Sequence, residues 1–521
     1  MKQGQLPLNL SFVHVKKIIH ALLVILVFSY CRNTTTSTQE KTTPTASSKS
    51  GNELAQIYCG GCHLYPEPTL LDKDTWTKEL LPNMGARLGI KTPNYDPFSK
   101  ISDFDAMMIE TENIYPTSPL IHPEDWNKII AFYKNEAPQY LPVFKHPKVT
   151  VGLKNFDVKN LKSPNFPPLV TLTKIDESSK QLFIGTLKGA LSTFSTRQKD
   201  IIPNDTFNIG SPPVALLKSK NETLLVLGIG TIHPNEQQEG SVFQIDLKSK
   251  QARKIMGNLK RPATFAALNT EKDIVIGEYG YQKGQLSYYK NGKKLDKILS
   301  YDGGATKVLT HDFNKDNLDD IAVLMAQGDE RITIYYADKS GEFTEKRVLR
   351  FPPVYGSSDM QLVDFNKDGY VDILYTNGDN EDFSPILKPY HGVRVFLNDG
   401  KDNFTEGVFY PMDGAFQARA ADFDLDGDMD IVVTSFFPYD KTKPDAHFRY
   451  LEQTKPFQFT AYTFREAVQG KWMTLDVGDA DGDGDADILI GSFVISLSGV
   501  NRRADKIEKI LPFIFLENKI K

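Results

Sequence analysis

Four nine-residue stretches share one arrangement of oxygen-bearing side chains, and this repeat constrains the fold more than any other feature. Each stretch has Asp or Asn at positions 1, 3 and 5 and Asp at position 9, and an apolar run follows at once. Position 6 is Asn or Gly, residues that tolerate the positive φ of a tight turn. The oxygen-bearing residues are Asp312, Asn314, Asp316 and Asp320; Asp364, Asn366, Asp368 and Asp372; Asp422, Asp424, Asp426 and Asp430; and Asp479, Asp481, Asp483 and Asp487.

So many carboxylates in nine residues repel one another unless a cation lies among them. Ca2+ suits this ligand set, because it takes about 6–8 oxygen ligands. An EF-hand would need Glu at position 12 and a following helix, but position 12 is Val323, Tyr375, Val433 or Ile490, each within a strand-like run. We therefore expect up to four calcium-binding loops between β-strands. Solvated acidic turns without metal are the alternative.

The four loops belong to a longer repeat. The strand that follows each loop recurs three more times upstream without the loop. Together these strands mark seven units at intervals of roughly 40–60 residues, the spacing of propeller blades. Units one to three lack the ligands, although Asp273 still matches position 9 in the third. Seven units of four short strands predict an all-β seven-bladed β-propeller over residues 148–521. The seventh unit ends at its third strand, Phe513–Leu516, so residues 148–156 are expected to supply the fourth strand and close the ring.

Units four to seven, over residues 301–521, resemble FG-GAP/VCBS repeats, the calcium-binding blades also found in integrin α subunits. The run from Val395 to Phe404 fits the third-strand pattern of that family. The resemblance implies a scaffold whose calcium ions hold loops rather than perform chemistry.

A second motif, Cys59-Gly-Gly-Cys62-His63, has the pattern of c-type haem attachment. The two thiols would form thioethers with one haem c, and His63 would bind its iron axially. A zinc site would lack further Cys ligands, and a thioredoxin-like redox pair would need a βαβ context that the sequence does not have.

Residues 51–142 resemble a small all-α class I cytochrome c domain, with the motif at the start and an amphipathic helix from Pro123 at the end. The distal iron ligand stays open. Met84 is the first candidate, Met107 and Met108 are alternatives, His122 is a further one, and the position could also be vacant.

The N-terminus reads as an export signal over residues 1–31. Lys16-Lys17 precede an apolar run that ends at Cys31, where a lipoprotein signal places its acylated cysteine. An uncleaved anchor or another cleavage point is the alternative. Residues 32–50 are rich in Thr and Ser and are expected to form a flexible tether. The folded part would then lie in the periplasm or at the cell surface, tethered to a membrane.

Composition adds one exclusion. The net charge is −5, and 17 of the 66 acidic residues lie in the four loops. Because no basic patch is clustered, we expect no nucleic-acid partner.

The long connections from second to third strands are expected to line the face opposite the metal loops. They run over residues 230–240, 278–284, 377–392, 436–447 and 492–506, and they could bind a redox partner protein, a small molecule or a glycan. We expect His391 and His447 to be surface histidines rather than catalysts. The polar and aromatic residues of these loops are His233, Tyr279, Tyr281, Tyr390, His391, Tyr439, His447, Arg502 and Arg503.

Three functions fit these features. The first is an exported electron-transfer protein whose propeller serves as a docking or ligand-binding scaffold. The second is a propeller dehydrogenase that uses the haem as electron acceptor. Quinone-dependent propellers of this kind usually carry a tryptophan motif in each blade, but Trp472 is the only tryptophan beyond residue 126. The third is a surface binding module of adhesin or lectin type. No catalytic residues are predicted.

Overall fold

The computed structural model describes residues 44–99, 101–160, 166–196, 202–219, 223–292, 296–380, 384–494 and 510–520. The export segment, Cys31, most of the tether, Arg502 and Arg503 lie outside these residues. Within the described ranges, no helix has the length and apolar character needed to cross a membrane.

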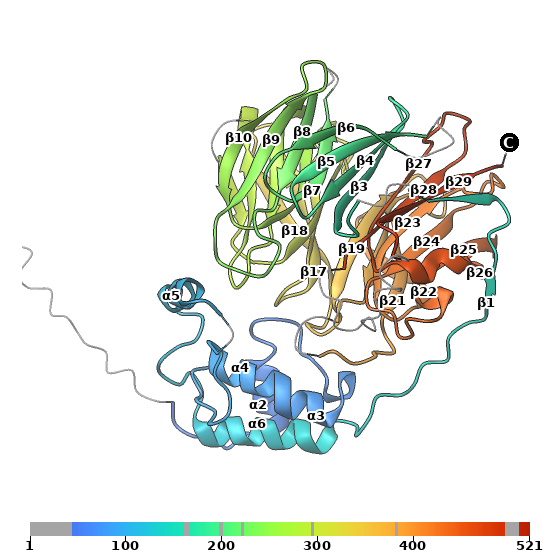
Figure 1. Ribbon diagram of the computed structural model, residues 1–521. Coiled ribbons are helices and arrows are strands. Elements are labelled where there is room, and N and C mark those ends of the chain that lie inside the picture. Colours follow the sequence, from blue (N-terminus) through green and yellow to red (C-terminus); the bar gives the residue numbers. More distant parts are fainter. Residues whose placement is uncertain are drawn as a thin grey trace, which may run out of the picture. The chain divides into compact units, whose positions relative to one another are not determined.

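Seven sheets, each built on a run of antiparallel strands, follow one another along the chain, which confirms the predicted seven-bladed propeller (Figure 1). The blades comprise β3 (Val170–Asp176), β4 (Gln181–Thr186), β5 (Ala190–Ser195) and β6 (Pro203–Asn208); β7 (Pro213–Lys218), β8 (Thr223–Gly228), β9 (Gly240–Asp246) and β10 (Gln251–Leu259); β11 (Pro262–Leu268), β12 (Thr270–Glu278), β13 (Gln285–Tyr289) and β14 (Lys297–Ser300); β15 (Ala305–His311), β16 (Asp320–Met325), β17 (Arg331–Ala337) and β18 (Phe343–Arg350); β19 (Ser357–Val363), β20 (Asp372–Asn377), β21 (Gly392–Asn398) and β22 (Phe404–Pro411); β23 (Ala415–Ala421), β24 (Asp430–Ser435), β25 (Phe448–Lys455) and β26 (Gln458–Thr463); and β27 (Trp472–Gly478), β28 (Asp487–Ser492) and β29 (Phe513–Asn518).

The second strand of a metal-loop blade is buried along its whole length. All six residues are buried in each of β16, β20, β24 and β28. Such a strand has a partner on each edge and a neighbouring blade on each face, which explains its continuous apolar run. The fourth strands lie at the outer edge and are more exposed; β18, for example, contains only exposed and half-buried residues.

The ring closes through the N-terminal part of the chain, as predicted, but with a different strand. β2 (Phe156–Asn160) pairs antiparallel with β29 and completes the seventh blade. β1 (Val149–Val151), which falls within the predicted closing segment, instead pairs parallel with β26 and extends the sixth blade to five strands. The predicted segment 148–156 therefore contains a strand, but that strand does not close the ring.

Five α-helices precede the propeller in the described residues: α2 (Gly51–Tyr58), α3 (Lys73–Thr75), α4 (Leu81–Arg87), α5 (Asp103–Thr111) and α6 (Pro123–Glu136). A 3-10 turn (Pro68–Leu70) and a π-helical turn (Trp76–Leu80) lie between them.

The first and last of these helices cross closely. A Cβ atom on Gly51 would lie 2.2 Å from the Lys128 carbonyl oxygen of α6, so only glycine fits this approach. Gly85 of α4 likewise lies against the Trp126 ring, 3.0 Å from where its Cβ would be. Glycine at these points brings the helices together around one apolar cluster.

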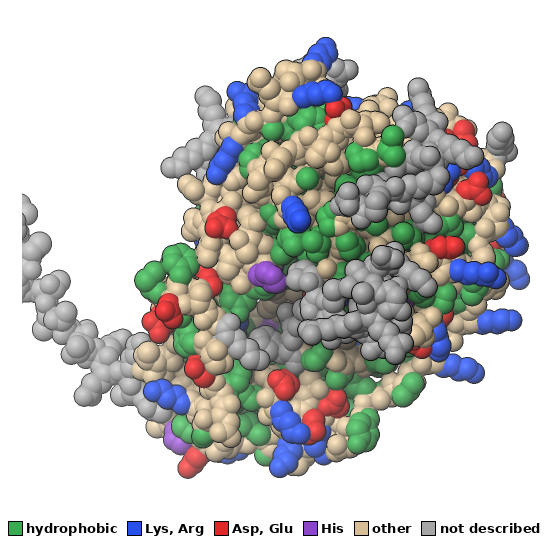
Figure 2. Space-filling model, viewed as in Figure 1, with side chains coloured by type: hydrophobic (Ala, Val, Ile, Leu, Met, Phe, Trp, Pro, Cys, Tyr) green, Lys and Arg blue, Asp and Glu red, His purple; other side chains and the backbone are tan. Residues whose placement is uncertain are grey.

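The helical segment packs on the propeller face that carries the long loops. The Tyr390 hydroxyl of the β20–β21 loop donates to the Leu70 carbonyl (3.1 Å), and Arg87 Nη2 donates to Gln282 of the β12–β13 loop (2.5 Å). The Glu236 amide of the β8–β9 loop donates to Asp105 (2.7 Å). Figure 2 shows the surface hollowed where the helices meet the propeller. Part of the face expected to receive a partner is thus covered by the chain's own helices.

Candidate functional site

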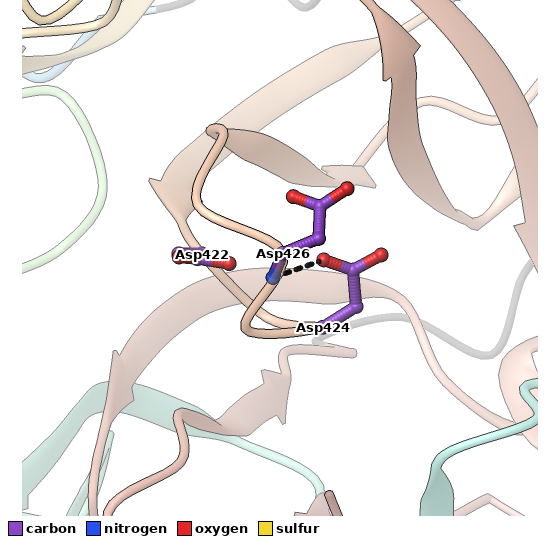
Figure 3. Close-up of side chains that lie close together, drawn as sticks. All are labelled: Asp422, Asp424 and Asp426. Atoms are coloured by element: carbon purple, nitrogen blue, oxygen red, sulfur yellow. Dashed lines mark hydrogen bonds between the residues drawn. The ribbon is translucent and has the colours of Figure 1, made fainter.

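The two most acidic loops bring three carboxylates together. Ligand oxygens of Asp422, Asp424 and Asp426 lie within 4.8 Å of one another, and those of Asp479, Asp481 and Asp483 do the same. In the β23–β24 loop, the Asp426 amide donates to the Asp424 carboxylate (3.2 Å), and the three side chains lie on one turn of the loop (Figure 3). Closely spaced carboxylate oxygens are the donor set that Ca2+ prefers.

The other two loops are built by the same backbone hydrogen bonds. The Asp316 and Asn317 amides donate to the two oxygens of Asp312 (3.0 and 2.8 Å). In the β19–β20 loop, the Asp368 and Gly369 amides donate to Asp364 in the same way (3.1 and 2.9 Å). The side chains at positions 3 and 5 also meet in both loops: Asn314 donates to Asp316 (3.3 Å), and Asn366 donates to Asp368 (2.9 Å).

Two positions of each loop require a positive φ, and the sequence pattern predicted only one. Position 6 adopts it in all four loops, as in Gly427 (φ 97°). Position 4 adopts it as well, although its residues are Lys315, Lys367, Leu425 and Gly482, with φ from 56° to 92°. Strain at a non-glycine residue costs about 1–3 kcal/mol, so the loop hydrogen bonds must offset it.

The position 9 aspartates have a structural role that the sequence did not predict. Asp320, Asp372, Asp430 and Asp487 are fully buried at the start of the second strand. In the seventh blade, Asp487 accepts the Ala480 amide from the loop (2.9 Å) and the Asn518 amide from the end of β29 (2.8 Å). The carboxylate thereby joins the metal loop to the third strand. Each oxygen keeps a second lone pair, so ligation by these residues remains a prediction.

Burial makes the charge on these aspartates costly. It raises the pKa of Asp320 to about 6 and the pKa values of Asp430 and Asp487 to about 7, although their backbone N–H donors act in the opposite direction. A cation beside the carboxylates would favour their ionised form.

One candidate ligand was missed in the sequence. Asp485, at position 7 of the last loop, is 2% exposed, and neither of its oxygens has a hydrogen-bond partner among the described residues. Burial, followed by the charge of Asp483, raises its pKa to about 7. A buried carboxylate without donors is unfavourable unless a cation compensates it. The predicted ligands occupy only positions 1, 3, 5 and 9, so only the burial of Asp485 reveals this candidate.

The Cys-His motif begins where α2 ends. Ser50 and Glu53 form a capping box at the start of this helix, and the Cys59 amide closes its last turn on Ala55 (2.8 Å). Gly60 follows because a Cβ there would lie 2.4 Å from the Gln56 carbonyl. Cys59 and Cys62 are free thiols, one half-buried and the other exposed. Burial raises the pKa of Cys59 to about 11, so its thiol is protonated at neutral pH.

His63 is held by its Nδ1 atom. Nδ1 lies 3.0 Å from the Leu64 carbonyl oxygen, an acceptor, so Nδ1 carries the proton and Nε2 keeps its lone pair. Burial lowers the pKa of His63; the hydrogen bond to Leu64 and the charge of Asp329 oppose this shift, while Arg350 and Arg87 add to it. A neutral imidazole with a free Nε2 is the form that binds a metal.

The candidates for a distal ligand lie in different surroundings. Met84 and Cys59 pack against the same apolar cluster. Met107 is 54% exposed and Met108 is half-buried, both on α5. His122 caps α6, where its Nδ1 accepts the Glu124 amide (3.3 Å). Met84 is therefore the candidate that shares its surroundings with the motif.

The residues of the helical segment fit a covalently held haem. Two free thiols and a neutral histidine follow one helix, and a thioether lies in the same cluster. Asn83, next to Met84, is fully buried, and neither of its amide atoms has a hydrogen-bond partner among the described residues. Leaving such a group unpaired costs about 1–3 kcal/mol, so this region suits a ligand with a polar group.

The polar and aromatic residues of the long loops differ in how deeply they are buried. His233 is exposed, and Tyr279, Tyr281 and Tyr439 are half-buried. The expectation that His391 and His447 are surface residues is wrong, because they are only 2% and 4% exposed. Burial lowers the pKa of both rings, and nearby Lys388 and Arg394 lower that of His391 further. Both histidines are therefore neutral, packed parts of the propeller.

Comparison with known proteins identifies the repeat. Residues 312–375 and 378–433 match the family model described as FG-GAP-like repeat. No curated protein matches the chain. Among solved structures, the Neurospora crassa Pan2 WD40 domain is 13% identical with a TM-score of 0.45, covering 72% of this chain and 98% of its own. The N-terminal domain of Nup159 is 12% identical with a TM-score of 0.41, covering 72% and 99%.

The class of protein follows from the sheets and the repeat match. The chain is a seven-bladed β-propeller with FG-GAP-like repeats, preceded by a few helices. The exposed aspartate triads are consistent with Ca2+ binding. The matched residues begin at Asp312, and the comparisons give no support to a cytochrome c identity for the helical segment.

Proposed function

We propose that the protein is an exported electron-transfer protein that carries one haem c on its helical segment and uses the propeller as a calcium-stabilised scaffold. One observation carries the proposal: Cys59 and Cys62 are free thiols directly beside a His63 whose Nε2 lone pair is available. Each thiol would add across one vinyl group of the porphyrin, and His63 would bind the iron.

The residues around the motif would each do one task. Leu64 holds the tautomer of His63 through its carbonyl. Tyr133 of α6 donates to the Pro66 carbonyl (2.7 Å) and so fixes the chain just after the motif. Met84 would supply a thioether from the same cluster. A bound haem supplies reversible one-electron transfer at its iron.

Calcium would act on stability rather than on electron transfer. Ca2+ does not change its oxidation state, and the loops lie at the opposite strand ends from the face that contacts the helices. The N-terminal signal and Cys31 would place the protein outside the cytoplasm on a membrane tether. A redox partner or ligand would bind the parts of the long-loop face that the helices leave open.

The test is to express the full chain in a host that matures c-type haem and to record its absorption spectrum. A sharp reduced α-band that survives acid–acetone extraction would support the proposal, because only covalently bound haem resists extraction. Cys59→Ser with Cys62→Ser should release the haem. A wild-type protein without covalent haem would refute the proposal.

The same preparation tests the distal ligand. Met84→Ala should abolish the weak absorption band that a thioether–iron bond produces. Met107→Ala is the matched control, because its side chain is exposed and its loss should leave the spectrum unchanged. A band that survives in Met84→Ala and disappears in Met107→Ala would assign the ligand to α5.

A further inference from the structure

The metal loop of the seventh blade, residues 479–487, is contacted by a turn of the first blade. This turn, residues 177–180, joins β3 to β4, the connection that carries the metal loop in blades four to seven. Its Glu177 carboxylate accepts the Asp479 amide (3.3 Å). Lys180 Nζ lies 3.4 Å from an Asp479 carboxylate oxygen and 3.3 Å from the Asp479 carbonyl oxygen. The first blade therefore places a cation at position 1 of a loop that belongs to its neighbour.

The loop has room for this lysine because its position 4 is glycine. A Cβ on Gly482 would lie 2.9 Å from Cε of Lys180. In the fourth blade, position 4 is Lys315, whose ammonium lies 4.4 Å from the centre of the Tyr370 ring in the next loop. That lysine contacts a ring, whereas Lys180 contacts the carboxylate of a predicted calcium ligand. Gly482 thus allows the contact between two blades as well as the positive φ of the turn (φ 92°).

Lys180 alone does not balance the charge of the loop. Five aspartates occur in it, at positions 1, 3, 5, 7 and 9. One Asp479 oxygen accepts the Gly482 amide (2.6 Å), and the other lies toward Lys180. Asp485 is 2% exposed, and neither of its oxygens has a hydrogen-bond partner among the described residues. The loop therefore still favours a further cation, and that cation would share Asp479 with Lys180.

We propose that Lys180 is a counter-ion of this loop, which stabilises the loop without calcium and lowers its affinity for Ca2+. The inference rests on the calcium part of the proposed function. The ammonium attracts the Asp479 carboxylate and repels a divalent cation bound to it, and both side chains are partly removed from water (23% and 27% exposed). The coupling is reciprocal, so Ca2+ in the loop weakens the contact between Lys180 and Asp479. Calcium and the first blade thus compete for one carboxylate.

The experiment is a Ca2+ titration of the full chain in competition with a fluorescent chelator, together with chemical unfolding in chelator and in excess Ca2+. Lys180→Met removes the charge and keeps most of the side chain. It should tighten one Ca2+-binding step by roughly 3–10-fold, because a nearby positive charge is lost. It should also lower the stability in chelator and leave the stability in excess Ca2+ unchanged. Lys180→Arg keeps the charge and should retain the wild-type values.

Lys174→Met is the matched control. Lys174 pairs with Asp476 (2.9 Å) across the same two blades, but Asp476 is not a predicted calcium ligand. Its loss removes a lysine–aspartate pair and one positive charge, as the loss of Lys180 does. This variant should lower the stability equally in chelator and in Ca2+, and it should leave Ca2+ binding unchanged.

Tighter binding in Lys180→Met, with a loss of stability confined to the chelator, would support the inference, because a purely structural contact would stabilise both states. Unchanged Ca2+ affinity, or an equal loss of stability in both conditions, would overturn it while calcium binding by the wild-type chain still supports a calcium-stabilised scaffold. A wild-type chain that binds no Ca2+ would overturn both this inference and the calcium part of the proposed function.

Discussion

Removal of calcium should make the stability of the propeller depend on pH. The buried carboxylates at position 9 of the loops would then have no cation beside them. The pKa of Asp487 rises from an ordinary value near 3.8 to about 7. Its folded pKa lies above its unfolded pKa, so the native state holds the proton more tightly. The resulting stability is complete below about pH 4 and is lost as the pH rises toward 7.

The magnitude follows from the size of the shift. A pKa rise of three units corresponds to about 4 kcal/mol, at about 1.4 kcal/mol for each unit. Asp430 shifts by a similar amount and Asp320 by less. Relaxation of the loops would reduce these values, and a loss of roughly 2–4 kcal/mol for each of the two most shifted sites is the expected scale.

The assay is chemical unfolding from pH 5 to pH 8, with a calcium chelator or with excess Ca2+. With the chelator, the free energy of unfolding should fall with rising pH and level off near pH 8. With Ca2+ it should not fall, because the cation takes the place of the proton. Asp487→Asn cannot titrate at this site and should show a smaller slope with the chelator. Identical pH profiles with and without Ca2+ would refute the reasoning.

Three further outcomes are expected. Asp481→Asn alters a half-buried loop residue and should weaken Ca2+ binding measured by calorimetry, while the protein in chelator keeps its stability. A loss of stability in chelator as large as the loss in Ca2+ would contradict a ligand role. Asp157→Pro should remove a hydrogen bond of the closing strand β2 to β29 and lower the melting temperature by several degrees. Thr150→Pro in the added strand β1 should cost less, and the reverse order would show that β1 closes the ring. Gly51→Ala should destabilise the helical segment by about 1–3 kcal/mol, followed by helical circular dichroism, because its Cβ would lie 2.2 Å from the Lys128 carbonyl oxygen. Gly61→Ala is the control, because its Cβ would lie 3.1 Å from the Ile57 carbonyl oxygen and needs a much smaller shift. Equal effects of the two substitutions would contradict the close crossing.

The metal-loop blades could be predicted from sequence because the second strand of each is buried along its whole length. The run Asp487–Ser492 has no polar alternation, and an acidic turn precedes it, so its position and its partner strands were fixed. The closing strand could not be located as firmly. Val149–Val151 and Phe156–Asn160 are both short and lie five residues apart, and which one pairs with β29 depends on the path of the chain.

The candidate site also has one part that residue spacing predicts and another part that depends on the folded chain. Spacing alone brings the three loop carboxylates together, since they occur on one turn, and it also places both cysteines beside His63. The burial of His391 and His447 could not be predicted, because it depends on which loops other parts of the chain cover. The contacts of Val354 and Tyr390 with the helical segment have no local signal either. They join segments far apart in the sequence and exist only in the folded chain.

The third blade distinguishes two roles of a metal loop: to bind calcium, and to join the second strand to the third through the position 9 carboxylate. It has Phe265 and Ala267 at positions 1 and 3 in place of ligands. Asp273 nevertheless accepts the Asn291 amide just beyond the third strand (2.7 Å), as Asp487 accepts that of Asn518 (2.8 Å). The carboxylate bond to the third strand therefore does not require calcium. Asp273 is half-buried, whereas the four aspartates of the metal loops are fully buried. Water can stabilise the charge of a half-buried carboxylate but not that of a fully buried one. Calcium would then serve the blades in which this bond is buried, by keeping its acceptor ionised.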